Sequence, residues 1–156
     1  MPRLLLLGLT FLILFPSPLL PAEGTDLLRT LALSRSLKCT FVTVMQGDWK
    51  GGSLSTSKET NQSFELHFDG IEIVKQKARL IGNQGVNNVA VTLTPSSLTF
   101  VEITPSGNPN FTTVFPAYKK GTKEFIAVTS RHLMFPGLPG DYPFPSQHHG
   151  SCQVWE

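Results

Sequence analysis

The sequence predicts an all-β protein, an antiparallel meander of about eight strands that closes or nearly closes into a barrel, with a β-sandwich as the alternative. Short runs of alternating apolar and polar residues recur between turn-forming residues along most of the chain, and no convincing amphipathic helix follows residue 38. Two cysteines, Cys39 and Cys152, lie in the first and the last of these runs. A meander of this length removes its exposed edges by closing into a barrel or by folding into two packed sheets.

The stretch 89–103 shows the alternation most clearly. Apolar residues alternate with small residues or threonines on both sides of a short break, which is the period of a half-buried strand. Pairing Leu93 with Leu98 places Val91 opposite Phe100 and gives one aliphatic and aromatic face. A shift of one residue would bury the threonines instead, so the pattern predicts a hairpin with this register.

The other strands are predicted from the same alternation and from turn residues. Residues 37–45 form the first predicted strand, and 46–62 are expected to be a polar loop with one short strand near Leu54. Asp69-Gly70 stands between two alternating runs and predicts a two-residue hairpin turn, because a type I′ turn needs residues that tolerate positive φ. Further strands are expected at 78–81, 111–115, 124–131 and 151–155.

The N-terminal residues have the pattern of a secretory signal peptide. Arg3 precedes an apolar run that is shorter than the about 20 residues of a spanning helix, and Ala22 supplies a small residue where a signal peptidase would cut. We expect 1–22 to be removed, with an uncleaved anchor as the alternative. Residues 23–36 would be a lead-in, either a short helix or flexible, before a single β domain over 37–156 that is secreted or periplasmic.

An exported chain with two cysteines is expected to form the disulfide Cys39–Cys152. This bond would join the first predicted strand to the last. The alternative is a reactive thiol, which needs an electropositive environment. The chain has 13 basic and 11 acidic residues and a net charge of +2, which gives no support to nucleic acid or an anionic membrane as a partner. No cofactor is expected.

The segment 132–150 departs from the alternation, with four prolines, three aromatic residues and no periodicity. Long structureless segments are often functional, and barrel mouths are frequent ligand sites. We expect a loop that binds a small apolar ligand or a protein partner, or one that covers the barrel mouth with its own aromatic side chains. The expected ligand-binding residues are Phe135, Tyr142, Phe144, Glu102, Arg131 and His132.

Glu102 falls on the inward face of the predicted hairpin. A buried carboxyl there would have a raised pKa and a role in binding. The alternatives are a position in solvent at the strand end, or an ion pair with an arginine such as Arg79 or Arg131.

The sequence has no metal-binding spacing and no nucleophile elbow, so an enzyme is not expected. Two alternatives to a binding protein stay open. One is a metal-dependent or hydrolytic enzyme that uses His132 and His149 with a carboxylate. The other is a structural component of an envelope or matrix.

Gly47-Asp48-Trp49 resembles the Gly-x-Trp signature at the first strand of lipocalin-like barrels. The resemblance implies a closed antiparallel barrel of the lipocalin or calycin size class. It covers three residues and follows the first predicted strand rather than opening it, and no functional residue is transferred from it.

Overall fold

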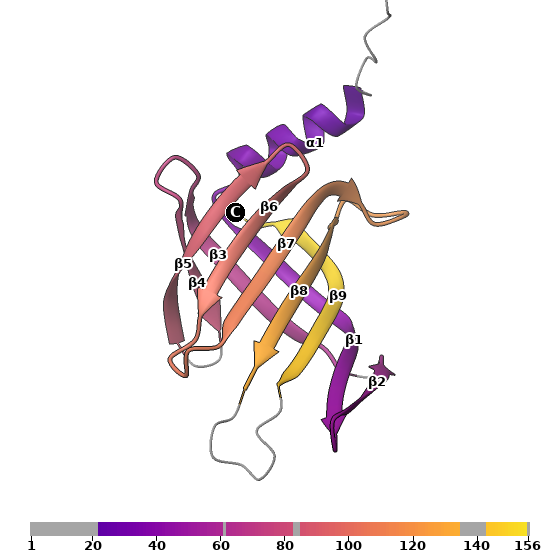
Figure 1. Cartoon of the computed structure of the whole chain (residues 1–156). Helices are drawn as coiled ribbons and strands as arrows, with labels where there is room; N and C mark the ends of the chain where they lie inside the picture. The colour runs from indigo at the N-terminus through magenta and orange to yellow at the C-terminus, as the bar shows by residue number, and fades with distance from the viewer. Residues whose placement is uncertain (1–21, 61, 83–84, 135–142, 156) are drawn as a thin grey trace, which may run out of the picture.

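The computed structural model describes residues 22–60, 62–82, 85–134 and 143–155, so most of the predicted signal peptide lies outside the described residues (Figure 1). The described part contains one helix and nine strands. These elements are α1 (Ala22–Leu33), β1 (Leu37–Lys50), β2 (Ser53–Glu59), β3 (Phe64–Glu72), β4 (Lys77–Gly82), β5 (Gly85–Thr94), β6 (Ser97–Ile103), β7 (Pro109–Tyr118), β8 (Phe125–Leu133) and β9 (Phe144–Val154).

The strands form one closed antiparallel barrel, as the alternation predicts. Each strand from β3 to β9 pairs with its neighbour in sequence, and β1 pairs with both β3 and β9 to close the ring (Figure 1). β1 is long enough to form two ladders along the edge opposite β9, because 37–41 pairs with β3 and 44–50 pairs with β2. β2 is therefore an additional strand outside the barrel of eight.

The predicted register of the central hairpin is confirmed. Leu93 pairs with Leu98 and Val91 pairs with Phe100 across β5 and β6. Val91, Leu98 and Phe100 are buried, whereas Thr92 on the opposite face is exposed. Burial of the aliphatic face selects this register, as expected from the period of the side chains.

The predicted turn at Asp69-Gly70 is wrong. β3 continues through both residues to Glu72, and the chain turns at 73–76 instead. Gly70 has a φ of 55° and lies where the β3–β4 register shifts, so it forms a bulge. A bulge needs a residue that tolerates positive φ just as a type I′ turn does.

Two predicted loops are shorter than expected. Residues 46–59 of the polar segment form a hairpin of β1 and β2 rather than a loop with one short strand. In the segment 132–150, residues 132–133 belong to β8 and 144–150 belong to β9, which leaves 134–143 between the strands. Pro145 lies in β9 just before its ladder with β1 begins, and the start of a strand is a place where a missing N–H is tolerated.

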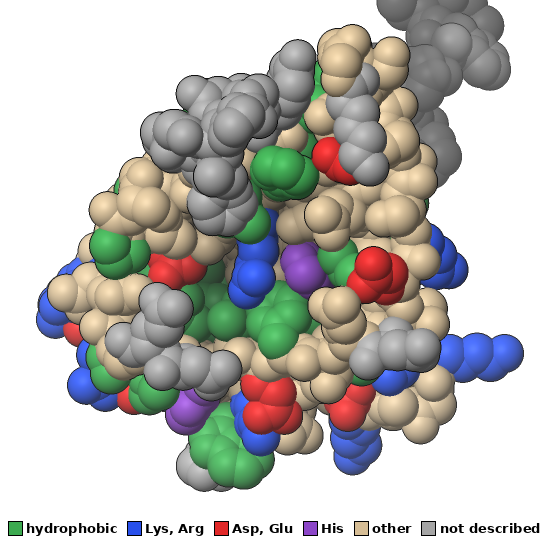
Figure 2. Space-filling view, turned by 90° about the horizontal axis from the view of Figure 1, so that it is seen from below, with side chains coloured by type: hydrophobic (Ala, Val, Ile, Leu, Met, Phe, Trp, Pro, Cys, Tyr) green, Lys and Arg blue, Asp and Glu red, His purple; other side chains and the backbone are tan. Residues whose placement is uncertain are grey.

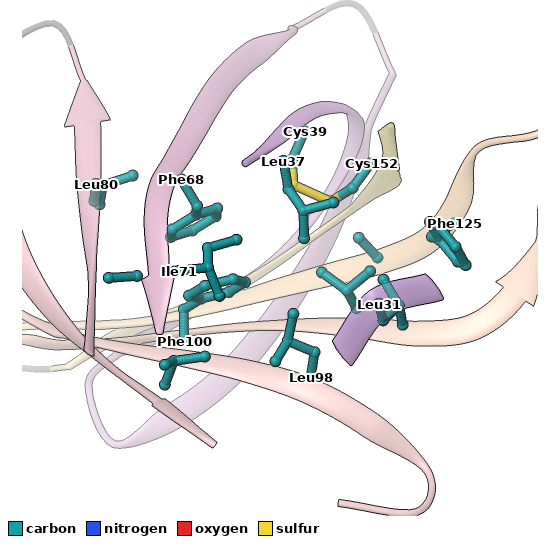
Figure 3. Close-up of a cluster of buried hydrophobic side chains, with 14 of the residues drawn as sticks. Leu31, Leu37, Cys39, Phe68, Ile71, Leu80, Leu98, Phe100, Phe125 and Cys152 are labelled. Carbon is teal, nitrogen blue, oxygen red and sulfur yellow. A yellow bond between two sulfur atoms is a disulfide. The ribbon is translucent and has the colours of Figure 1, made fainter. Parts of the chain in front are cut away.

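The core fills the half of the barrel next to α1. The helix lies across this end (Figure 1), and its Leu31 is fully buried between the barrel strands (Figure 3). Deeper in the barrel, the rings of Phe68 and Phe100 stack with centroids 3.9 Å apart. The largest buried apolar side chains are Phe41, Phe68, Phe100, Phe125, Leu31, Leu37, Ile71 and Leu98.

The predicted disulfide is confirmed, and it joins β1 to β9. Cys39 and Cys152 stand directly opposite each other in this ladder, and both are fully buried. The two backbones approach closely here, because a Cβ at Gly150 would overlap the carbonyl oxygen of Thr40. Glycine is therefore required at 150 for β9 to pack against β1. Among the described residues, no helix has the length and apolar character needed to cross a membrane.

Candidate functional site

The inward-facing side chains change from apolar to polar toward the end of the barrel opposite α1. Along β6 the inward positions run from Leu98 through Phe100 to Glu102. Along β8 they run from Phe125 to Arg131. We call this region the polar end of the barrel. In Figure 2, which views it from below, basic and histidine side chains lie among hydrophobic ones near the middle of this face.

A cavity of about 20 Å³ remains inside the polar end. This volume holds about one water molecule, so the barrel interior is largely filled by its own side chains. The cavity is lined by Leu66, Phe68, Leu80, Phe100, Glu102, Asn110, Thr112, Thr129 and Arg131. Its lining is apolar toward the core, whereas carboxylate, amide, hydroxyl and guanidinium groups line the rest.

Two asparagine side chains hold the Glu102 carboxylate. Asn110 Nδ2 donates to Glu102 Oε2 at 2.8 Å, and Asn87 Nδ2 donates to Oε1 at 3.2 Å. Of the two arginines expected as partners, Arg79 instead donates to both carboxylate oxygens of Asp69, at 2.8 and 2.6 Å. Arg131 lies near Glu102 and interacts with it through charge. Glu102 therefore faces inward, with neutral amides rather than an arginine as its hydrogen-bond donors.

Arg131 is the cation of the polar end. Its guanidinium lies over the ring of Phe64, with Cζ 4.3 Å from the ring centroid, a cation–π contact. Burial lowers the pKa of Arg131, and the nearby charge of Glu102 acts in the opposite direction. An arginine remains protonated in proteins even so. A half-buried positive charge is thus present beside the cavity at any ordinary pH.

His148 lies on the inward face of β9, opposite Thr129 of β8. Its ring meets the ring of Phe64 edge-on at 4.8 Å, and its Nε2 is 3.2 Å from Ser146 Oγ. Burial, followed by the charges of Arg131 and His149, lowers the pKa of His148 to about 4. At neutral pH the imidazole is therefore uncharged.

The structure brings some of the predicted site residues together and separates others. Glu102 and Arg131 share the cavity lining. Phe144 pairs with Leu133, which places both on the inward side of the barrel rim by alternation from Arg131. His132 is exposed on the outer face, with its ring 5.7 Å from that of Phe111. Phe135 and Tyr142 lie outside the described residues.

Phe64, Asn110 and His148 are site residues that the sequence analysis missed. Asn110 stands opposite both Glu102 and Arg131 in the ladders of β7, so alternation along β7 could have placed it inside. His148 was missed because its segment was expected to be a loop without a defined facing.

The two histidines of the enzyme alternative lie apart on the outer face. His132 pairs with Pro145 and His149 pairs with Val128, at different levels of the β8–β9 ladder. In the described ranges, no group of three or more His, Cys, Asp or Glu side chains could hold a metal ion.

The chain matches no protein-family model, no curated protein and no solved structure. The residues that resemble the lipocalin signature, Gly47 to Trp49, lie in the part of β1 that pairs with the additional strand β2. The functional interpretation therefore rests on the geometry of the polar end.

Proposed function

We propose that this protein is an exported, non-enzymatic binding protein that takes a small, partly apolar ligand at the polar end of its barrel. The observation that carries the proposal is the set of charged and amide side chains inside a barrel whose other half is apolar. Polar groups inside a protein reduce its stability unless they are hydrogen-bonded. A cluster of this kind is expected where it serves binding.

The size of the cavity limits how such a ligand sits. About 20 Å³ accepts one small group, so the rest of the ligand would lie at the rim of the barrel. Phe64 inside the barrel, with Leu133 and Phe144 at the rim, supplies apolar surface there. The segment 134–143 joins the two strands at this rim.

The disulfide supports export. Cys39 and Cys152 form a bond that closes the barrel, and disulfides form and persist in oxidising compartments. The signal-peptide pattern of the N-terminal residues agrees with secretion or a periplasmic location. No observation on the described part of the chain favours the enzyme or the structural alternative, and both stay predictions.

Thermal shift and NMR titration of the oxidised protein with octan-1-ol and octanoate would test the proposal. A ligand that binds only the folded state raises the melting temperature. We expect at least one of the two compounds to raise the Tm and to shift amide resonances around Glu102 and Arg131. Phe64→Ala should weaken this binding by about tenfold or more, because it removes apolar contact worth at least about 1.4 kcal/mol.

Phe115→Ala is the matched control, because Phe115 is an exposed phenylalanine in β7. It should leave the binding of both compounds unchanged. The proposal is wrong if neither compound binds at millimolar concentration, or if Phe64→Ala and Phe115→Ala have equal effects on binding.

A further inference from the structure

The Arg131 guanidinium lacks a hydrogen-bonded counter-ion within the described residues. The interactions that the structure shows for it are the face of Phe64 and the through-space interactions with Glu102 and with His148. Two exposed arginines of the barrel differ from Arg131: Arg79 forms a two-point ion pair with Asp69, and Arg35 donates to the carbonyl oxygen of Ile71 at 3.1 Å. The planar N–H donors of the Arg131 guanidinium, whose geometry suits a carboxylate, are therefore available to bind a ligand.

Glu102 is not placed to be that partner. Both of its oxygens accept hydrogen bonds from the amides of Asn87 and Asn110, which hold the carboxylate on the β6–β7 side. An anion at Arg131 would be repelled by Glu102, so it must approach from the opposite side of the guanidinium. This side belongs to β9.

On the β9 side, Arg131 stands directly opposite Ser146. The Ser146 hydroxyl and the His148 ring, 3.2 Å apart, face inward next to it. The hydroxyl can donate a hydrogen bond to an anion, and so can the imidazole N–H. His149, the other titratable group near His148, is on the outer face.

One further atom indicates that this interior is incomplete. Asn110 Oδ1 is buried and has no hydrogen-bond partner among the described residues. Asn110 pairs with Arg131 in the β7–β8 ladder and lines the same cavity. A buried acceptor without a donor is rare unless a water supplies one, and the cavity of about 20 Å³ beside Asn110 has room for one water. A carboxylate only accepts hydrogen bonds, so this atom indicates a hydrated interior and is not a contact of the anion.

We infer that the polar end binds the carboxylate of a small apolar acid, with Arg131 as the direct ion partner, Ser146 as a second donor and the apolar part of the acid along Phe64. The inference rests on the proposed function, since it names the chemical class of the ligand for the same site. A charge-assisted, two-point contact of this kind is stronger than a hydrogen bond between neutral groups.

The test compares octanoate with octan-1-ol, which share a chain and differ in the charge of the head group. The wild-type protein should bind octanoate at least about tenfold more tightly at neutral pH, since a hydrogen bond to a charged group contributes about 1.5–3 kcal/mol. Arg131→Gln should abolish this preference by weakening octanoate alone. Arg131→Lys keeps the charge without the fork, so it should retain part of the preference.

Lys120→Gln is the matched control, because it removes one positive charge from the exposed turn between β7 and β8. It should leave the preference for octanoate unchanged. If octan-1-ol binds the wild type as tightly as octanoate, or if Arg131→Gln keeps the preference, the inference is wrong while the proposed function stands. If neither compound binds, both are wrong. The wild-type comparison decides between these outcomes even if Arg131→Gln does not fold.

Discussion

His148 makes the chemistry of the polar end depend on pH. Its imidazole lies inside the barrel, edge-on to Phe64 and beside the positive charge of Arg131. Burial and this charge both oppose protonation, and together with the charge of His149 they lower its pKa to about 4. In the unfolded chain, by contrast, a histidine titrates near pH 6.5.

This difference predicts a loss of stability on mild acidification. As the pH falls through about 6.5, the unfolded chain takes up a proton at this histidine while the folded protein does not, so the free energy of unfolding decreases until about pH 4. Above about pH 6.5 this histidine is neutral in both states, so the free energy of unfolding is not reduced by its protonation. His148→Gln should remove this part of the pH dependence, measured as the urea midpoint at several values between about pH 7.5 and 4.5.

His132→Gln serves as the comparison, because His132 is exposed on the outer face of the same barrel. It should keep the acid slope of the wild type. Equal slopes in the wild type and in His148→Gln would show that His148 is not held in its neutral form by the fold.

The residues of the polar end were only partly predictable from the sequence. The period of the hairpin placed Glu102 inside correctly, because β6 is regular from Leu98 to Ile103. Arg131 was named as a possible ion partner of Glu102, without an argument for the side of the strand on which it lies. His148 could not be placed, since the four prolines that precede it concealed the alternation of β9.

At the scale of the elements, a strand pair was predictable where local and long-range preferences agree. The β5–β6 hairpin has a turn at Pro95-Ser96 and one apolar face, so only one register buries that face. β3 is the opposite case. Gly70 has the backbone freedom that a hairpin turn needs, yet pairing with β4 continues beyond it and uses that freedom for a bulge.

The helix α1 contributes to the core, which its sequence did not predict. The sequence left open whether this segment is a short helix or flexible. Leucines at 27, 28 and 31 give it an apolar side, but an isolated segment of this length is only marginally helical. Its stability comes from Leu31, which is fully buried beside Leu98 and Phe125 (Figure 3). The packing of Leu31 against the barrel therefore stabilises a helix that the helix propensity of its residues alone would leave marginal.

We expect Leu31→Ala to lower the free energy of unfolding by about 3 kcal/mol, the usual cost of truncating a fully buried leucine. Leu33→Ala is the matched control two residues further along α1, where the leucine is 69% exposed. It should change the stability by less than about 0.5 kcal/mol. Urea unfolding followed by circular dichroism measures both, and equal effects would show that α1 does not close the barrel in solution.

At the scale of the whole molecule, the two ends of the barrel differ in what their inward-facing side chains contribute: one end stabilises the fold and the other carries the polar groups. The end under α1 is filled with aromatic and aliphatic side chains, and the β1–β9 seam is joined by the disulfide. This half contains much of the buried apolar cluster that stabilises the barrel. The polar end can then keep charged groups, a small cavity and an amide oxygen that has no hydrogen-bond partner within the described part of the chain. These features reduce stability, and a rigid scaffold tolerates them.

The division of tasks predicts a large effect of the disulfide on stability. Cys39 and Cys152 are 113 residues apart in sequence, so without the bond the closing ladder must overcome the entropy of a loop that spans nearly the whole domain. On the chain-entropy model the bond contributes about 5 kcal/mol, a large part of the 5–15 kcal/mol typical of a domain. The double variant Cys39→Ala with Cys152→Ala should lower the urea midpoint accordingly.

Reduction of the wild type with dithiothreitol removes the same bond but keeps both sulfur atoms. It should therefore lower the free energy of unfolding by nearly the same amount as the double variant does. If the two shifts differ widely, the variant has also disturbed packing around the fully buried Cys39 and Cys152. If both treatments lower the free energy of unfolding by less than about 1 kcal/mol, then β1 and β9 stay paired by their ladder and close contacts alone. In that case the hydrogen-bonded ladder between β1 and β9, rather than the disulfide, would maintain the geometry of the polar end.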